Sequence, residues 1–100
     1  MNFETISVNK INKYINKDNT ILIDIRQACE YYKGHIPTAI NIPYQNFEEV
    51  KVEIPKNKML ILYCERGGIS MALSRELSRQ GYNVKNLYGG ISAYRGSLEI

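Results

Sequence analysis

The sequence predicts an α/β fold built on a parallel β-sheet with helices on both of its faces. Strand-like runs alternate along the chain with short segments of helical periodicity, and short turns join them. Two of the runs, residues 21–25 and 59–63, are almost continuous in apolar residues. A strand with that pattern is covered by side chains on both sides of the sheet, as in parallel sheets flanked by helices.

In the first half of the chain, turn residues and caps mark the ends of the expected elements. Ser7 is a good N-cap for a short amphipathic helix, and Gly34 ends a single helical turn. Pro43 stops a β-like run, and Pro55 follows a short helix. The expected elements are a strand end bracketed by Ile6 and Val8, a helix along Val8, Ile11 and Ile15, a strand at 21–25, a helical turn at 30–33, a strand at 39–42 and a helix at 44–52.

The second half contains the clearest strand and the longest helix. The strand at 59–63 ends immediately before Cys64. Ser70 is the expected cap of the following helix, and Gly81 is its expected C-terminal stop. The apolar face of that helix is expected to consist of Ile69, Leu73 and Leu77. A last strand at 84–88 and a short helix at 91–94 complete the order.

The composition is that of one ordinary globular domain over residues 1–100. Hydrophobic residues make up 44% and charged residues 23%, so the chain is not of the disordered class. The net charge of +3, from 13 basic and 10 acidic residues, is spread along the chain without a basic run. We therefore expect no nucleic-acid partner, although a local pocket for a small anion remains compatible with this charge.

The expected location is the cytoplasm, without membrane contact. The chain starts without a basic segment followed by a long apolar stretch, and its longest apolar run, 59–64, is too short to cross a bilayer. In a reducing compartment Cys29 and Cys64 are expected to be free thiols. Together with the one histidine, His35, they lack clustered ligand spacing, so no metal site is expected.

Cys64 is the strongest candidate for a reactive side chain. It lies at the carboxyl end of a predicted parallel strand, where open α/β sheets bind ligands. Gly67 and Gly68 allow successive backbone N–H groups to turn toward one centre, and Arg66 adds a positive charge. With the start of a helix, these features are expected to lower the thiol pKa and give a nucleophilic thiolate. The alternative is a small buried hydrophobic residue before a tight turn.

Motifs along nearly the whole chain resemble those of the rhodanese family. Its N-terminal signature is similar to LIDIR at 22–26 with Glu30, GHIP at 34–37 and AINIP at 39–43. Its strand and active-site loop are similar to residues 60–70, and its closing motif is similar to LYGGI at 87–91 with Tyr94. The matches occur in the family's order, which makes them specific as a set.

The resemblance implies a five-stranded parallel sheet flanked by helices, in a single rhodanese-like domain over residues 1–100. It implies a sulfurtransferase that carries sulfur as a persulfide on Cys64, without a cofactor. Sulfur would come from a small anionic donor such as thiosulfate, with release of sulfite, or from another donor, and pass to cyanide or a thiol. The implied substrate-binding residues form the loop after the cysteine: Glu65, Arg66, Gly67, Gly68, Ile69 and Ser70.

One position departs from the family pattern. Many rhodaneses have an arginine five residues after the cysteine, where this chain has Ile69. The available cation is Arg66, beside the negative Glu65, so weaker thiosulfate binding is expected. A protein sulfur donor or acceptor is then an alternative partner, and a relay module that acts within a complex is the alternative function.

A cysteine phosphatase is the less favoured alternative. Dual-specificity phosphatases of the cell-cycle type share the rhodanese fold, but they need a longer loop that ends in an arginine six residues after the cysteine. That position is Ser70 here.

For four other side chains we expect mainly a structural role. Asp24 and Arg26 are expected at the same sheet edge as the loop, as an ion pair or hydrogen-bonded brace, and a surface pair between Arg26 and Glu30 is the alternative. His35 is expected to bind backbone in a turn, because an ionised thiol has no proton for a general base to remove. Cys29 is expected to be inert, with a resolving thiol as the alternative.

Overall fold

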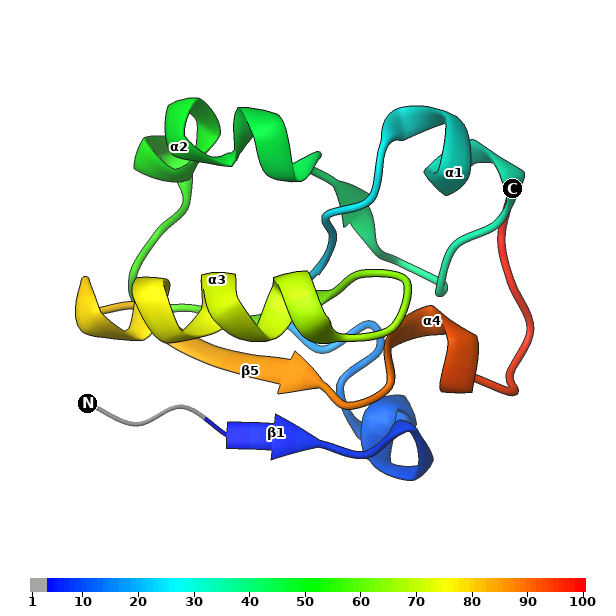
Figure 1. The fold of residues 1–100 in the computed structure, drawn as a ribbon. Helices are drawn as coiled ribbons and strands as arrows, with labels where there is room; N and C mark the ends of the chain where they lie inside the picture. The colour runs from blue at the N-terminus through cyan, green and yellow to red at the C-terminus, as the bar shows by residue number, and fades with distance from the viewer. Residues whose placement is uncertain (1–3) are drawn as a thin grey trace.

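The computed structural model describes residues 4–100, and its centre is a five-stranded sheet in which every strand pair is parallel. The strand order is β1-β5-β4-β2-β3. The central strand is β4 (Met59–Tyr63), between β5 (Asn83–Leu87) and β2 (Thr20–Asp24), with β1 (Glu4–Ile6) and β3 (Ile40–Asn41) at the edges. The alternation of strands and helices along the chain produces this arrangement (Figure 1).

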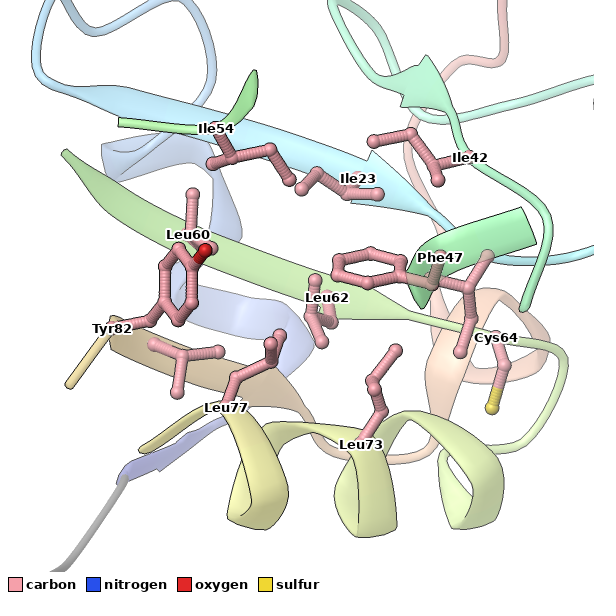
Figure 2. Packing of buried hydrophobic residues seen from close by; sticks show 12 residues of the cluster. Ile23, Ile42, Phe47, Ile54, Leu60, Leu62, Cys64, Leu73, Leu77 and Tyr82 are labelled. Carbon is pink, nitrogen blue, oxygen red and sulfur yellow. The ribbon is translucent and has the colours of Figure 1, made fainter. Parts of the chain in front are cut away.

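Helical segments cover both faces of the sheet because successive side chains of β4 point to opposite sides. Leu60 and Leu62 belong to the cluster under α2 (Phe47–Val50) and α3 (Gly68–Arg79), as Figure 2 shows. Ile61 and Tyr63 belong to the opposite cluster, to which η1 (Val8–Lys13), α1 (Ala28–Lys33) and α4 (Gly90–Ala93) contribute. The central strand is therefore buried on both sides, as its apolar run predicts.

Cys64 continues the alternation of β4 onto the α3 face. Its side chain belongs to the same cluster as Leu62, and Figure 2 shows it at the end of that cluster, near Leu73 of α3. In the sheet register Asp24 is paired with Tyr63, so β2 and β4 end at the same level. The segments that follow these two strands consequently meet at one edge of the sheet.

Two predicted helices have a different form in the structure. The predicted helix at 8–15 is the 3₁₀ helix η1, over Val8–Lys13, and the predicted helix at 44–52 is divided into η2 (Tyr44–Asn46), α2 and η3 (Lys51–Glu53). In each of these stretches a single side chain is fully buried: Ile11 in the first and Phe47 in the second. Such short segments gain little from α-helical propagation, so tighter turns are favoured.

The start of α3 corrects two predictions. The helix begins at Gly68 with Gly67 as N-cap, at φ 100°, so Ser70 does not cap it. Ile69 is not on the buried face, since it is 54% exposed, whereas Ser70 is fully buried. The earlier start follows from the turn at Gly67. As a consequence, the helix face that packs on the core carries Ser70 in place of Ile69. The predicted stop at Gly81, with φ 95°, is confirmed.

Within residues 4–100, no helix has both the length and the apolar composition to cross a bilayer.

Candidate active site

The connection between β4 and α3 wraps backbone N–H groups around the sulfur of Cys64. The Gly67 N–H lies 3.2 Å from Sγ and the Ser70 N–H lies 3.4 Å from it. The backbone of Ile69 also donates toward the sulfur. The thiol in turn lies 3.4 Å from Ser70 Oγ, to which it donates. Sγ is thus surrounded by donors from the last residue before α3 and from its first turn.

Two glycines and the start of α4 hold the loop in this conformation. Gly67 has a left-handed backbone, and a Cβ there would lie 3.2 Å from the Gly89 nitrogen. Gly90, also left-handed, packs so closely that a Cβ would lie 2.5 Å from the Cys64 carbonyl oxygen. That oxygen accepts from the Ile91 N–H at 3.0 Å, and the Glu65 oxygen accepts from the Ser92 N–H at 2.9 Å. The loop carbonyls therefore point to α4, while its N–H groups point to the sulfur.

Burial and hydrogen bonding act in opposite directions on the pKa of Cys64. Burial raises this pKa, because a charged sulfur is poorly solvated there. The hydrogen bond between Cys64 and the Ser70 side chain and the hydrogen bonds from the N–H groups of Ser70, Gly67 and Ile69 lower it, and together they outweigh burial. The net result is a thiol pKa below its ordinary value, as the sequence predicts, with the surrounding donors as the main lowering cause.

A pocket of about 530 Å³ opens beside Cys64 and has both apolar and charged walls. Ile25, Tyr44 and Ile69 supply apolar surface, while Arg26, Glu65 and Arg66 supply charge. Arg66 is exposed and makes no ion pair with any residue in 4–100. Four of the predicted substrate-binding residues line the pocket, namely Glu65, Arg66, Gly68 and Ile69. Gly67 and Ser70 instead contact the sulfur from the buried side.

The buried Asp24 and the partly buried Arg26 form a brace next to this pocket. Arg26 Nη2 lies 2.8 Å from Asp24 Oδ2, and Arg26 Nε lies 3.1 Å from both carboxylate oxygens. Arg26 also donates to the Gly34 carbonyl at 2.7 Å, and its Nη1 lies 3.7 Å from Glu65 Oε1. The partner of Arg26 on its own segment is thus Asp24, not Glu30, and the positive charge of Arg26 is balanced by two carboxylates.

Comparison with known proteins assigns the chain to a family. Residues 7–97 match the family described as the rhodanese-like domain. The chain belongs to the rhodanese-like family. The crystal structure of SSP1007 from Staphylococcus saprophyticus superposes with a TM-score of 0.88 at 27% sequence identity, over 98% of this chain and 100% of that chain. The five-stranded parallel sheet with flanking helices is therefore the family fold.

Two relatives bear on the general activity of this rhodanese-like chain. A protein of Allochromatium vinosum named sulfurtransferase is 37% identical over 78 residues, which are 77% of this chain and 73% of the relative. A tRNA sulfurtransferase of Desulfurococcus amylolyticus is 38% identical over 81 residues, or 81% of this chain, and the chain spans only 16% of that relative. What the two names have in common is sulfur transfer, and they support it as the general activity.

Two candidate residues of the rhodanese-like chain lie outside the pocket. His35 Nδ1 is 3.0 Å from the Tyr31 carbonyl oxygen, its ring is stacked on that of Tyr31, and Nε2 is 3.7 Å from Glu99. This is the backbone-bound histidine that the sequence predicts. Cys29 is exposed on α1 and is a free thiol, like Cys64. Over the described part of the chain, residues 4–100, no three His, Cys, Asp or Glu side chains cluster as metal ligands would.

Two groups of site residues are not predicted from the sequence. Ile25, Tyr44 and Gln45 line the pocket from segments remote from the loop. Asn86 of β5 lies under the loop, fully buried, with Oδ1 2.5 Å from Ser70 Oγ. One signal was available for Asn86: a polar residue stands two positions after Val84, on the inward-facing side of a predicted strand.

Proposed function

We propose that this protein is a sulfurtransferase that carries sulfane sulfur as a persulfide on Cys64. The observation that supports this function is the ring of N–H groups from Gly67, Ile69 and Ser70 around Sγ. Donors fixed by the backbone stabilise a thiolate before the reaction and the negative charge of a persulfide after it, without reorganising. A thiolate so held is the nucleophile that persulfide formation requires.

With thiosulfate as donor, the reaction has two displacement steps. The Cys64 thiolate attacks the outer sulfur of thiosulfate, a new S–S bond forms to Sγ, and the S–S bond of thiosulfate breaks. Both electrons of the broken bond leave with sulfite. An acceptor thiolate or cyanide then attacks the outer sulfur of the persulfide, and the Cys64 thiolate is regenerated. The balance needs no oxidant, reductant or cofactor.

The charges around the pocket support only weak attraction for a small dianion. Arg26 is already balanced by Asp24 and Glu65, so Arg66 is the cation left to bind thiosulfate. Ile69 presents an apolar side chain where many rhodaneses have arginine. The same apolar wall supports a second candidate function, a relay module that receives sulfur from the persulfide of a partner protein.

Phosphoryl transfer has much weaker support. Position 70 would need an arginine that grips a phosphate with two donors. It is a serine with no exposed surface, and its hydroxyl is engaged with Cys64 and Asn86 beneath the sulfur.

Intact-mass measurement tests the proposal directly. Wild type and Cys64→Ser are incubated with thiosulfate or with a persulfidated carrier protein and then desalted. The intact mass of each is measured before and after reduction. A reducible adduct of one sulfur atom from thiosulfate, absent in Cys64→Ser, supports the enzyme. An adduct formed only from the protein donor supports the relay module. Absence of an adduct with both donors contradicts the proposed function.

A further inference from the structure

A small polar cluster is buried beneath the active-site loop, between α3 and β5. It contains Ser70 and Asn86, both with no exposed surface, and Ser70 contacts Cys64 directly. Within residues 4–100 the Asn86 Nδ2 has no hydrogen-bond partner. An unpaired buried amide is costly, and an apolar side chain of similar size would avoid that cost in a strand. The presence of an amide at this position therefore requires a physical explanation.

The Ser70 hydroxyl has more neighbours than its one proton can serve. Its Oγ lies 2.5 Å from Asn86 Oδ1, 3.2 Å from the Gly67 carbonyl oxygen and 3.4 Å from Cys64 Sγ. With a protonated thiol, one arrangement satisfies the shortest contacts. Cys64 donates to Ser70 Oγ, and Ser70 donates to Asn86 Oδ1.

A thiolate changes this pattern. It has no proton to donate, and an anion beside the lone pairs of Ser70 Oγ is repelled unless the hydroxyl proton turns toward it. Once that proton points to sulfur, Ser70 Oγ and Asn86 Oδ1 face each other with no proton between them. A half-turn of the Asn86 amide exchanges Oδ1 for Nδ2, and the amide then donates to Ser70 Oγ. The Nδ2 donor that was unpaired thereby gains a partner.

We propose that Asn86 is a positioning residue that acts through Ser70: when Cys64 is negatively charged, the Asn86 amide donates to Ser70 Oγ and turns the hydroxyl proton toward the sulfur. The proposal rests on the proposed function only in requiring an anionic Cys64. It gives the reactive sulfur a further donor besides the backbone N–H groups. Charged and neutral sulfur correspond to the two orientations of the amide.

Within residues 4–100 no hydrogen bond or ion pair joins another ionisable side chain near the sulfur to Ser70 or Asn86, although Arg66 and Tyr88 line a second hollow together with Asn86. Glu65 and Arg66 from the loop, Arg26 from the segment after β2 and Tyr44 from η2 line the pocket on the open side. Substitutions of Asn86 leave all four unchanged, so a difference between variants reports the buried cluster.

The test uses the pH dependence of Cys64 alkylation by iodoacetamide, in a Cys29→Ser background so that one thiol reacts. Asn86→Leu and Ser70→Ala are each expected to move the ionisation midpoint upward and to slow alkylation about tenfold at a pH below the original midpoint. Asn86→Leu in the Ser70→Ala background is expected to cause no further shift. Ser74→Ala, which removes another buried hydroxyl one turn along α3, is the matched control and should leave the midpoint unchanged.

A measurement without substitution of Asn86 keeps the proposal testable if the leucine variant does not fold. The side-chain ¹H–¹⁵N signals of Asn86 should shift with pH at the Cys64 midpoint, and this transition should be absent in Cys64→Ser. Any of three results would overturn the proposal. The first is an unchanged midpoint in a folded Asn86→Leu variant, and the second is additive shifts in the double variant. The third is that the Asn86 amide signals do not change when Cys64 ionises. These outcomes do not depend on persulfide formation, so they are distinguishable from failure of the proposed function in the mass experiment.

Discussion

The two cysteines both lie near the amino end of a helix, yet their surroundings differ. Cys29 is the second residue of the six-residue α1 and is exposed to solvent. Cys64 precedes the twelve-residue α3, is buried, and accepts hydrogen bonds from the N–H groups of Gly67 and Ser70. Proximity to a helix start is thus common to both thiols, whereas enclosure by inward-pointing N–H groups belongs to Cys64 alone of the two.

This difference shows what makes one thiol a candidate nucleophile. A helix dipole near an exposed side chain is screened by water and contributes little. Around Cys64 the chain first turns through a left-handed glycine, which directs several N–H groups at a single atom. The turn at Gly67, which brings the N–H groups of the first turn of α3 onto the sulfur, distinguishes the two sites.

The largest expected effect comes from substituting each cysteine separately. Cys64→Ala should abolish persulfide formation and sulfur transfer, because Cys29, the other thiol, is not surrounded by the N–H groups of the loop. Cys29→Ser should keep transfer within about twofold of wild type, as for a surface substitution away from the site. Steady-state transfer to a thiol acceptor measures both. Equal damage from the two substitutions would show that a second thiol participates and that the single-nucleophile scheme is wrong.

The next test compares two adjacent glycines of the loop. Gly67→Ala should lower the rate of persulfide loading at least about tenfold, because a left-handed alanine costs roughly 1–2 kcal/mol and its Cβ presses on the Gly89 nitrogen. Gly68→Ala is the control, since a Cβ there meets nothing within 4 Å. Loading is followed by mass, with thermal unfolding as a check on folding. Similar rates for the two alanine variants would refute a role for the Gly67 conformation.

Charge at the rim of the pocket should have a smaller effect, confined to anionic donors. Ile69→Arg should lower the thiosulfate concentration needed for half-maximal loading about tenfold through charge-assisted hydrogen bonds, while Ile69→Gln should not. Arg66→Ala should raise that concentration by about three- to fivefold, as expected for an exposed cation. Loading by a neutral organic sulfur donor should change little in all three variants. A similar change with the neutral donor would indicate distortion of the loop instead of a charge effect.

The smallest expected effect is on stability. The Cys64 pKa is lowered on folding from about 9.0, so between the folded and unfolded values the unfolded chain binds more protons. The stability of wild type relative to Cys64→Ser should therefore rise with pH through this window, level off above the unfolded pKa, and lose the increment as pH falls through the folded pKa. Denaturant unfolding at several pH values, with reductant present, measures this difference in the free energy of unfolding. A difference that falls with rising pH would contradict a stabilised thiolate.

The sequence predicts the fold well because its main signals are local. The apolar runs at 21–25 and 59–63, and the turn at Gly81, become β2, β4 and the end of α3. The short helices are less predictable, since packing decides between 3₁₀ and α-helical turns in segments that are anchored by one side chain. Ser70 shows the same limit: its type suits a cap, but the loop geometry starts the helix at Gly68 and buries the hydroxyl.

For the site, the sequence indicates the cysteine, its loop and the pair Asp24–Arg26 at the same sheet edge, but not the residues that only tertiary packing brings to the site. The strand-cysteine-glycine order predicts inward N–H groups, and the structure has them. Asn86 and Tyr44 reach the site through tertiary packing, which no spacing within the loop could predict. Arg26 depends on the common level at which β2 and β4 end, and its close partner Asp24 fixes it there.

The contacts from α4 to the carbonyls of Cys64 and Glu65 have a consequence for how this site can change over evolution. The main chain holds the sulfur through its N–H groups and is itself held by α4, so the backbone hydrogen bonds to the sulfur do not depend on which side chains occupy positions 65, 66 and 69. Those positions can exchange charge, size and polarity while the reactive group stays intact. The left-handed backbone and the close packing of Gly67 and Gly90, by contrast, leave almost no freedom for substitution.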